Sequence, residues 1–546
     1  MKFQTLLLSS CLSLASSQAT VTPRNPTVKL KDAAYEGTTT KITISPSSTG
    51  AATAVTVNKF LGIRFGSPPP KRFLAARLPS PSPRNDSTSF IRATTQPFSC
   101  TEREDCLFLN LFAPAPAPNN SSTKKKDEKK PVPVMIWWHG GALQSGSISG
   151  TDGSILAANE NVIVIAAQYR LGVFGFPGKV PGIPPTELNA GFGDQKLVLE
   201  WVKDNINLFG GDPDRVTIFG ESAGAVSVDA KLLSQPFEKE KSLFQGAIMQ
   251  SGGLHTFTRV ALGIGRDVTG LGTGNREDEM PFFTLARALN CELEGEKVLP
   301  CVQAKTFDEV KSAVSRVNLL FPPVDDDGLS SVGDSDSARR AGRTVDVPVL
   351  VGSTFDEGNI FPTAGIASKG FDQWVDVIYP GSNDTTNREA VKRAYAPGTS
   401  WQIQTEADAK HMLHSDFHFA CTTTYDANLI AALGTNPIWR YVFNASLPGG
   451  RLAGHGSDVA FVFGPSSQAA SKANQELSRK MMAAWGAFAR DPASGPGWVP
   501  YGSVKESLAN IGGEGGRDGI TLVDPVVVDG RCPVFDDAYD PDRPRS

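Results

Sequence analysis

The sequence predicts an α/β fold built on a central, mostly parallel sheet that helices cover on both faces. Short, continuous apolar runs carry this prediction, because strands buried on both faces of a parallel sheet have this composition. Segments of helical composition separate the runs, and such alternation of strands and helices is typical of parallel sheets. The apolar runs lie at residues 132–138, 162–166, 216–219, 246–249 and 347–352. The helical segments between them include 154–159 and 194–209.

The N-terminal part of the chain adds further strands to this sheet. Residues 20–63 contain short alternating runs, at 28–30 and 41–44, and 107–112 begins another strand. Residues 113–131 form a low-complexity insert rich in Pro, Ala, Asn, Ser and Lys. Such a composition predicts an exposed, mobile loop.

The C-terminal third of the chain is more helical, with long candidate helices at 402–433 and 469–490. No internal repeat is found along the chain. We therefore expect residues 20–546 to form a single large α/β domain with inserted helices rather than several independent domains.

Composition and charge exclude several classes of partner. The 546 residues are 40% hydrophobic and 20% charged, with a formal net charge of −4. The basic runs are short lysine clusters at 124–126 and 129–130, so we expect neither nucleic acid nor an anionic membrane surface as a partner. No stretch reaches the roughly 18 to 20 apolar residues that a membrane-spanning helix needs. We expect no stable membrane insertion.

The N-terminus has the composition of a secretory signal. Lys2 supplies a positive charge, residues 6–14 are mostly apolar, and Ser17-Gln18-Ala19 offers a small-x-small cleavage site. The apolar run is too short to span a bilayer. We therefore expect residues 1–19 to be removed and the mature protein to be secreted.

Secretion gives meaning to the cysteines and to the glycosylation sequons. Cys11 leaves with the signal, and six cysteines remain: Cys100, Cys106, Cys291, Cys301, Cys421 and Cys532. An even number in an oxidising compartment indicates disulfides, although 15 pairings are formally possible. Short separations favour Cys100–Cys106 and Cys291–Cys301, which leaves Cys421 with Cys532. Candidate acceptor asparagines are Asn85, Asn119, Asn120, Asn383 and Asn444.

One pentapeptide, Gly-Glu-Ser-Ala-Gly at 220–224, carries the strongest chemical signal in the chain. The apolar run 216–219 precedes it and a stretch of helical composition, 225–233, follows it. Strand, Gly-x-Ser-x-Gly and helix are the context of a nucleophile elbow, in which the serine sits on a strained turn. Only very small residues fit two positions before and after such a serine, which explains the glycines. Ser222 is the candidate nucleophile.

A serine hydroxyl is a weak nucleophile until a base removes its proton, so Ser222 requires a histidine and an orienting carboxylate. Behind a nucleophile elbow, the acid and then the histidine follow the serine along the chain. His455, which glycines flank in a loop after the predicted strands, is the candidate base. The acid should follow the strand at 347–352, where Asp356 and Glu357 are adjacent. The pattern alone leaves both carboxylates open.

The backbone N–H groups that stabilise an oxyanion are expected after the strand at 132–138. His139-Gly140-Gly141-Ala142 is an HGGG-type loop with alanine in the third glycine position. The N–H of Ala223, the residue after the nucleophile, would be the other donor. We interpret His139 as a support of this loop rather than as a base.

Other polar residues admit a chemical and a structural interpretation. His411, His414 and His418 share one helical face, as metal ligands can, but only Asp416 lies nearby to complete a site. We interpret them as packing or surface residues and expect no metal and no cofactor. Glu221 either acts electrostatically on the site or caps the turn, and the sequence leaves both open.

These motifs together resemble the type-B carboxylesterase/lipase family, which includes the cholinesterases and has the α/β-hydrolase fold. The motifs occur in family order and cover nearly the whole mature chain. They are EDCLFLN at 104–110, WWHGGAL at 137–143, YRLGVFGF at 169–176, NAGFGDQ at 189–195, FGGDPDRVTIFGESAG at 209–224, MQSGG at 249–253, DEG at 356–358 and HGSDVAFVFG at 455–464.

The resemblance implies roles for particular residues. Glu357, second in the Asp-Glu-Gly run, would be the triad acid beside Ser222 and His455. Gly141 and Ala142, with Ala223, would be the oxyanion donors. Glu104 and Arg170 would form the structural ion pair of the family, while Cys106 and the Cys291–Cys301 pair match its disulfide positions.

The sequence also departs from the family pattern. The cysteine that matches Cys106 usually closes a long loop, which forms a lid in the lipases and carries a cation-binding tryptophan in the cholinesterases. With Cys100 as partner, only five residues intervene, and residues 20–136 contain no tryptophan. Neither a long lid nor choline specificity is therefore expected.

The sequence thus predicts a secreted, glycosylated serine hydrolase that cleaves a small-molecule carboxylic ester through an acyl-enzyme on Ser222. A triacylglycerol lipase of the same family is the alternative enzyme. A cholinesterase-like adhesion protein is the non-enzymatic alternative, which the intact set of Ser, Glu and His argues against. The sequence gives no acyl or alcohol specificity and no oligomeric state.

Overall fold

The computed structural model describes most of the chain after the expected signal. The described residues are 25–44, 52–67, 72–81, 90–115, 130–234, 242–256, 281–293, 295–326, 335–360, 370–378, 385–400, 402–447, 452–464, 471–513 and 519–539. Residues 1–19, nearly all of the insert at 113–131, and the sequons Asn85, Asn119, Asn120 and Asn383 lie outside them.

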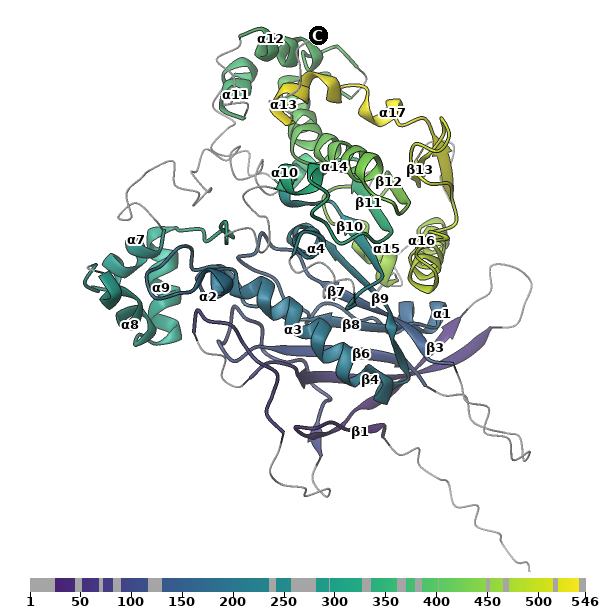
Figure 1. Cartoon of the computed structure of the whole chain (residues 1–546). Coiled ribbons are helices and arrows are strands. Elements are labelled where there is room, and N and C mark those ends of the chain that lie inside the picture. Colours follow the sequence, from purple (N-terminus) through teal and green to yellow (C-terminus); the bar gives the residue numbers. More distant parts are fainter. Residues whose placement is uncertain are drawn as a thin grey trace, which may run out of the picture.

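A large twisted sheet crosses the molecule and is parallel through its centre (Figure 1). Its strands run in the order β14-β13-β12-β11-β10-β9-β7-β8-β6-β4-β3, and every neighbouring pair from β8 to β13 is parallel. The strands are β3 (Thr38–Ile44), β4 (Thr53–Arg64), β6 (Phe108–Pro114), β7 (Val132–Trp138), β8 (Ile163–Ala167), β9 (Gly211–Glu221), β10 (Gly246–Gln250), β11 (Val349–Thr354), β12 (Ile438–Phe443), β13 (Leu508–Ile511) and β14 (Ile520–Val523). A small second sheet contains β1 (Thr27–Lys29), β2 (Ala34–Glu36) and β5 (Ile91–Arg92).

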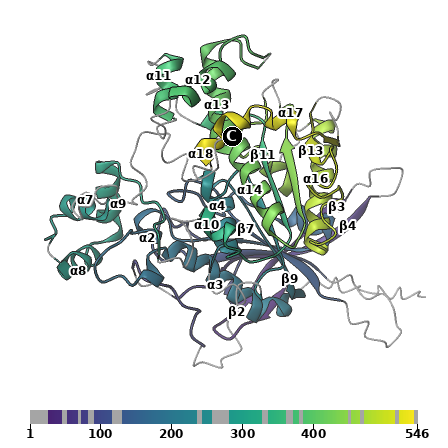
Figure 2. The same cartoon turned by 45° about the horizontal axis from the view of Figure 1, so that its top comes forward.

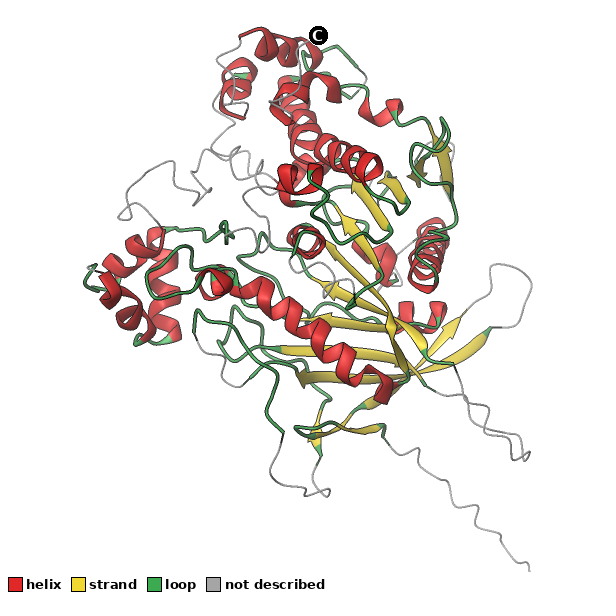
Figure 3. Cartoon of the chain, viewed as in Figure 1, coloured by secondary structure: helices red, strands yellow, loops and turns green. Residues whose placement is uncertain are grey.

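Helices cover both faces of the central sheet, as the red and yellow elements of Figure 3 show. One face packs against α3 (Ala190–Asn205) and α4 (Ala223–Leu232), whose apolar side chains join the larger core. The other face packs against α1 (Ser154–Glu160), α15 (Val459–Phe463) and α16 (Lys472–Arg490). The central strands are buried along their whole length because they have a helical layer on each side.

Two groups of helices extend beyond the sheet (Figure 2). The first contains α7 (Pro281–Ala288), α8 (Val298–Gln303) and α9 (Phe307–Val317). The second contains α11 (Phe371–Ile378), α12 (Thr385–Ala394) and α13 (Glu406–Ser415), which surround a small apolar core of their own. The other α-helices that the structure describes are α2 (Gly172–Gly175), α10 (Ser335–Arg340), α14 (Cys421–Leu433), α17 (Val526–Asp529) and α18 (Asp536–Tyr539).

The expected fold class is confirmed, and the sequence errs mainly at the ends of elements. The strand at 132–138 has the predicted bounds, whereas β9 begins at Gly211, five residues before the predicted start. The predicted helix at 402–433 is a series of three: α13, a π-helical turn at Asp416–Ala420, and α14. A π turn needs one extra residue in the helical repeat, and hydrophobic spacing does not reveal it.

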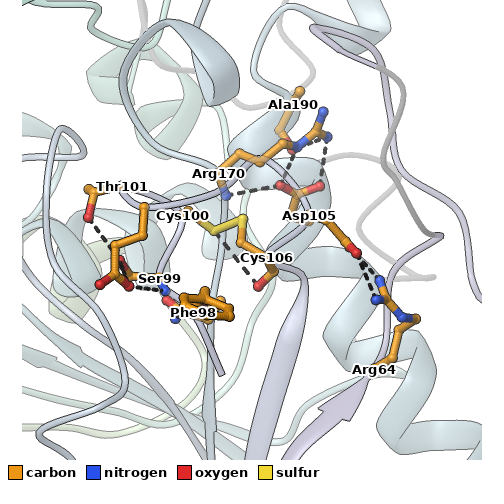
Figure 4. Close-up of a disulfide and its surroundings, with 12 residues drawn as sticks. Arg64, Phe98, Ser99, Cys100, Thr101, Asp105, Cys106, Arg170 and Ala190 are labelled. Carbon is orange, nitrogen blue, oxygen red and sulfur yellow. Dashed lines mark hydrogen bonds and ion pairs between the residues drawn. A yellow bond between two sulfur atoms is a disulfide. The ribbon is translucent and has the colours of Figure 1, made fainter. Parts of the chain in front are cut away.

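Three disulfides join the cysteine pairs that the separations favoured: Cys100–Cys106, Cys291–Cys301 and Cys421–Cys532. Figure 4 shows the first of them, beside the ion pair of Arg64 with Asp105. The Cys100–Cys106 bond closes a loop of five residues, so no long lid is tied down at this position.

The expected ion pair between Glu104 and Arg170 is wrong. Arg170 instead binds both oxygens of Asp194 through Nε and Nη2, each at 2.7 Å, and both side chains are buried. Glu104 pairs with Arg72. A buried guanidinium needs a bidentate acceptor aligned with its planar fork, and Asp194, early in α3, supplies it.

Candidate active site

The site lies at one edge of the sheet, where several parallel strands end. The loop 139–142 follows β7, Ser222 follows β9, and Glu357 follows β11. The loop that carries His455 comes after β12. Because these strands are parallel, their carboxyl ends meet at the same edge, and residues distant in sequence come together there.

Ser222 occupies a sharp turn between β9 and α4. Its backbone has φ 55° and ψ −121°, a conformation that costs a non-glycine residue about 1–3 kcal/mol. A Cβ on Gly220 would lie 2.5 Å from the carbonyl carbon of Gly224. One on Gly224 would lie 2.0 Å from the carbonyl oxygen of Trp138. Both glycines are therefore required by the close packing of the turn.

The imidazole of His455 contacts a buried carboxylate. His455 Nδ1 lies 2.5 Å from Glu357 Oε2, and the backbone N–H of Thr354 donates to Glu357 Oε1 over 2.6 Å. Asp356, the carboxylate that the sequence left as an alternative, instead faces His411, with Oδ1 3.2 Å from Nε2. Of the two adjacent carboxylates, only Glu357 therefore contacts the candidate base.

The other imidazole nitrogen faces the nucleophile turn. His455 Nε2 lies 3.2 Å from Oε1 of Glu221, which directly precedes Ser222, and a Cβ on Gly456 would lie 2.9 Å from the same oxygen. Within the described residues, Ser222 Oγ and His455 form no direct hydrogen bond. Such bonds are often long in ligand-free enzymes and tighten when a substrate binds. Glu221 thus lies against the candidate base, a position that the sequence did not predict.

The carboxylates around His455 set its charge. Burial alone lowers the pKa of His455, but Glu357 and Glu221 outweigh it and raise the pKa to about 9. Burial, together with the carboxylates of Asp458 and Glu357, raises the pKa of Glu221 to about 7, against the opposing charge of His455. The site therefore holds a proton that His455 must lose before it can act as a base.

The loop 139–142 lies beside Ser222, the candidate nucleophile. A Cβ on Gly140 would lie 3.0 Å from the Ser222 Cβ. Gly141 and Ala142 both have positive φ, 111° and 55°, so the loop turns sharply at the two expected donors. The N–H of Ala223, at the start of α4, has no acceptor within its own helix. The loop that carries two of the expected oxyanion donors thus contacts Ser222 through Gly140, and the third, Ala223, follows Ser222 in the chain.

His139 packs against this loop and supports it. Its ring is buried, stacks on Tyr169 at 4.6 Å between centroids, and has Nδ1 2.8 Å from the carbonyl oxygen of Gly140. Burial lowers its pKa to about 4. The hydroxyl of Tyr169 donates to the His139 carbonyl over 2.7 Å. A neutral, packed imidazole matches the structural interpretation of this residue.

A hydrogen-bond network that the sequence did not predict surrounds Asp458, which lies in the same loop as His455. Asp458 Oδ2 accepts hydrogen bonds from Tyr441 Oη at 2.8 Å and from Gln250 Nε2 at 2.9 Å. Gln250 in turn accepts from Trp485 Nε1 over 3.1 Å. Asp458 follows His455 by three residues, so its position in the loop was the available signal. The network fixes the base loop to β10, β12 and α16.

Phe419 also contacts the base and was not expected. Its ring lies 4.9 Å from that of His455, centroid to centroid, and it belongs to the π-helical turn after α13. Of the histidines of the suspected metal pattern, His414 and His418 stack at 5.0 Å between ring centroids, whereas His411 faces Asp356. No group of three or more His, Cys, Asp or Glu side chains in the described part of the chain could hold a metal ion.

A model described as the carboxylesterase family matches residues 26–518. The chain belongs to the carboxylesterase family. Its central sheet and covering helices agree with the α/β-hydrolase fold of that family.

Curated relatives match over most of their length. The chain is 32% identical to acetylcholinesterase of Bungarus fasciatus over 82% of this chain and 77% of that protein. It is 32% identical to carboxylesterase 5A of Felis catus, over 84% and 87%, and 30% identical to cholinesterase of Mus musculus, over 80% and 75%. Family membership supports ester hydrolysis as the class of activity.

No helix among the described residues is long and apolar enough to cross a membrane.

Proposed function

We propose that this protein is a serine carboxylic ester hydrolase that acts through an acyl-enzyme on Ser222. The observation that carries the proposal is the position of His455, between the buried carboxylate of Glu357 and the strained turn that holds Ser222. The fully buried Glu357 is oriented by a backbone N–H, as the orienting acid of a triad requires.

The proposed reaction has two halves. Ser222 Oγ attacks the ester carbonyl carbon while His455 Nε2 accepts its proton, and Glu357 stabilises the imidazolium that forms. The N–H groups of Gly141, Ala142 and Ala223 stabilise the oxyanion. The alcohol then leaves with the proton from His455. Water repeats the attack on the acyl-enzyme, and the carboxylic acid is released.

Covalent labelling tests the proposal. A fluorophosphonate should form one adduct per chain, located on Ser222 by peptide mass spectrometry, and should abolish hydrolysis of a soluble p-nitrophenyl ester. A reversible inhibitor that competes with the ester should protect against labelling. An active enzyme without an adduct on Ser222 would contradict the proposed mechanism, and a chain with neither adduct nor turnover would favour a binding protein.

The short loop at Cys100–Cys106 supports an esterase rather than a lid-gated lipase. We expect hydrolysis rates on p-nitrophenyl esters to follow soluble substrate concentration, with no jump when the ester passes its solubility limit and forms an emulsion. The measurement is the initial rate across that limit for a series of acyl chain lengths. A marked rise at the interface on long chains would assign the protein to the triacylglycerol lipases instead.

The pH dependence follows from the charge of His455. Because two carboxylates raise its pKa above the ordinary value of 6.5, His455 is protonated and inactive as a base at acidic pH. We expect kcat/KM to increase with pH, with a midpoint above 6.5. Replacing one of the carboxylates, as in Glu221→Gln, should lower this midpoint. A pH–rate profile of both proteins checks the sign, and an upward shift in the variant would contradict it.

We also propose that the mature protein is secreted. Three disulfides support this localisation, because such bonds persist in oxidising compartments. Asn444, directly after β12, is the one candidate glycosylation site among the described residues, and it is half-buried. Intact-mass measurement of the secreted chain distinguishes removal of residues 1–19 from their retention and counts the attached glycans.

A further inference from the structure

A second cluster of charged side chains lies behind the nucleophile helix. It contains Asp229 on α4, His255 after β10, Asp336 and Arg339 on α10, and Asp426 on α14. We call these five residues the buried charge cluster. Asp229, Arg339 and Asp426 are almost completely buried, and only Asp336 has a substantially exposed side chain. None of the five belongs to the proposed triad or to the oxyanion loop.

The cluster is closely paired. Arg339 forms an ion pair with Asp229 and lies 3.8 Å from Asp426 Oδ1. His255 Nδ1 lies 2.5 Å from Asp426 Oδ1, and its Nε2 lies 3.4 Å from Asp336 Oδ1. The Tyr425 hydroxyl donates a hydrogen bond to Asp336 and accepts one from Arg340. The cluster thereby joins α4, α10 and α14 to the segment after β10.

The segment 251–256 is held by this cluster. The backbone N–H of Leu254 donates to Asp229 Oδ2 over 2.8 Å, and His255 binds Asp426. Gly253 fits between the two carboxylates, because a Cβ there would lie 3.0 Å from Asp426 Oδ2 and 3.3 Å from Asp229 Oδ2. Backbone and side chains of the segment are thus fixed on two carboxylates.

The other end of the same segment supports the nucleophile turn. A Cβ on Gly252 would lie 2.6 Å from the carbonyl oxygen of Ser222, so the two backbones are in direct contact. The N–H of Ser222 donates to the carbonyl of Gln250 over 2.9 Å. Ser251 has a positive φ of 54°, a strained backbone that persists only where its surroundings hold it. The position of the segment therefore sets the position of Ser222.

Burial of these charges is better explained by positioning than by stability. Replacing a buried ion pair with well-packed apolar residues is often neutral or stabilising, whereas removing one partner is strongly destabilising. Burial alone lowers the pKa of His255, but Asp426 and Asp336 raise it to about 9, so the ring donates from both nitrogens at neutral pH. Directional, charge-assisted contacts of this kind fix geometry.

We infer that Asp229 is a positioning residue for the nucleophile, acting through Leu254 and the segment 251–256. The inference rests on the proposed function of Ser222. Both oxygens of Asp229 accept, one from Arg339 and one from the Leu254 N–H. An asparagine at this position has one acceptor and one donor, so it must direct its NH2 group at one of these two donors. The substitution Asp229→Asn therefore releases one contact while it preserves the shape of the side chain.

The test compares Asp229→Asn with wild type on a soluble p-nitrophenyl ester and a fluorophosphonate. Because small displacements of a reacting group are costly, we expect kcat to fall about tenfold and the rate of Ser222 phosphonylation to fall by a similar factor. KM should change less than about twofold, since no substrate contact is lost. A purely structural role would lower the melting temperature without this change in kcat.

The matched control is Asp529→Asn. Asp529 pairs with the buried Arg440 and accepts from Thr424, and it lies on α17. This variant should lose thermal stability but keep the wild-type kcat and phosphonylation rate. If Asp229→Asn does not fold, His255→Gln keeps a donor toward Asp426 and should show the same kinetic pattern at about threefold.

The outcomes separate the two proposals. If wild type is active and the folded Asp229→Asn variant has the same kcat and the same phosphonylation rate, the positioning role of Asp229 is overturned. The proposed function then remains intact. An equal loss of kcat in Asp529→Asn also overturns it, because the effect would then be general. Wild type that is neither labelled on Ser222 nor active overturns the proposed function itself.

Discussion

Ser222→Ala is expected to lower kcat on a soluble ester by at least about 10⁴-fold, because the acyl-enzyme can no longer form. His455, Glu357 and the oxyanion loop remain, but a triad acts as a unit, and the residual rate comes from binding and oxyanion stabilisation alone. The melting temperature should change little, since the Ser222 hydroxyl forms no hydrogen bond with another described residue. Assays of ester hydrolysis with enzyme concentrations in the micromolar range measure this residual rate.

A matched control is available at the opposite end of the same helix. Ser234 lies two residues after α4, and its hydroxyl donates to the carbonyl of Ala230. Ser234→Ala should retain the wild-type kcat and the fluorophosphonate adduct on Ser222. Full turnover by Ser222→Ala would rule out the acyl-enzyme on this residue, and loss of activity in both variants would indicate damage to the fold around α4.

Glu357→Gln is expected to lower kcat by about 10³-fold or more. Thr354 N–H donates to Oε1 of Glu357, so the carbonyl oxygen of a glutamine would stay with Thr354 and its NH2 group would face His455 Nδ1. The imidazole would then have to accept at Nδ1 and carry its proton on Nε2, which is the wrong tautomer for a base toward Ser222. Loss of the carboxylate also lowers the pKa of His455, so the pH–rate midpoint should move down.

The adjacent carboxylate provides the control for this variant. Asp356 contacts His411 and not His455, so Asp356→Asn should keep most of the activity and the wild-type pH midpoint. Measured kcat/KM against pH for both variants decides between the carboxylates. A large loss in Asp356→Asn with little loss in Glu357→Gln would assign the acid to Asp356.

Sequence predicts those parts of the fold and site whose signals are local. The run at 132–138 is apolar throughout because it is buried on both sides, and its strand has the predicted bounds. The nucleophile turn could be predicted because its motif is contiguous in the sequence: Gly220 contacts Gly224, although Gly224 itself packs against the distant Trp138. The resemblance to the family then selected Glu357, which indeed contacts His455 in the structure.

Contacts between residues far apart in the sequence could not be predicted in this way. Arg170 and Asp194 pair because α3 places the aspartate within reach of both guanidinium nitrogens, and neither residue type indicates its partner. Phe419 reaches the base because a π turn shifts the register of the helix that carries it. The cluster around Asp229 combines four segments that are far apart in the sequence, and none of them indicates its partners.

The loops that carry Glu357 and His455, the proposed acid and base, are joined by backbone pairing. Asp356 and Gly454 form a parallel bridge, Asp356 N–H donates to the Ala453 carbonyl over 2.8 Å, and Phe355 N–H donates to Phe443 at the end of β12. We therefore expect Glu357 and His455 to shift together when this side of the sheet moves. Thermal motion should leave the separation of His455 and Glu357 almost constant and change mainly the separation of His455 from Ser222. In the proposed mechanism, opening and closing of the proton-transfer path would then be a relative motion of the unit on β9 and the unit on β11 and β12.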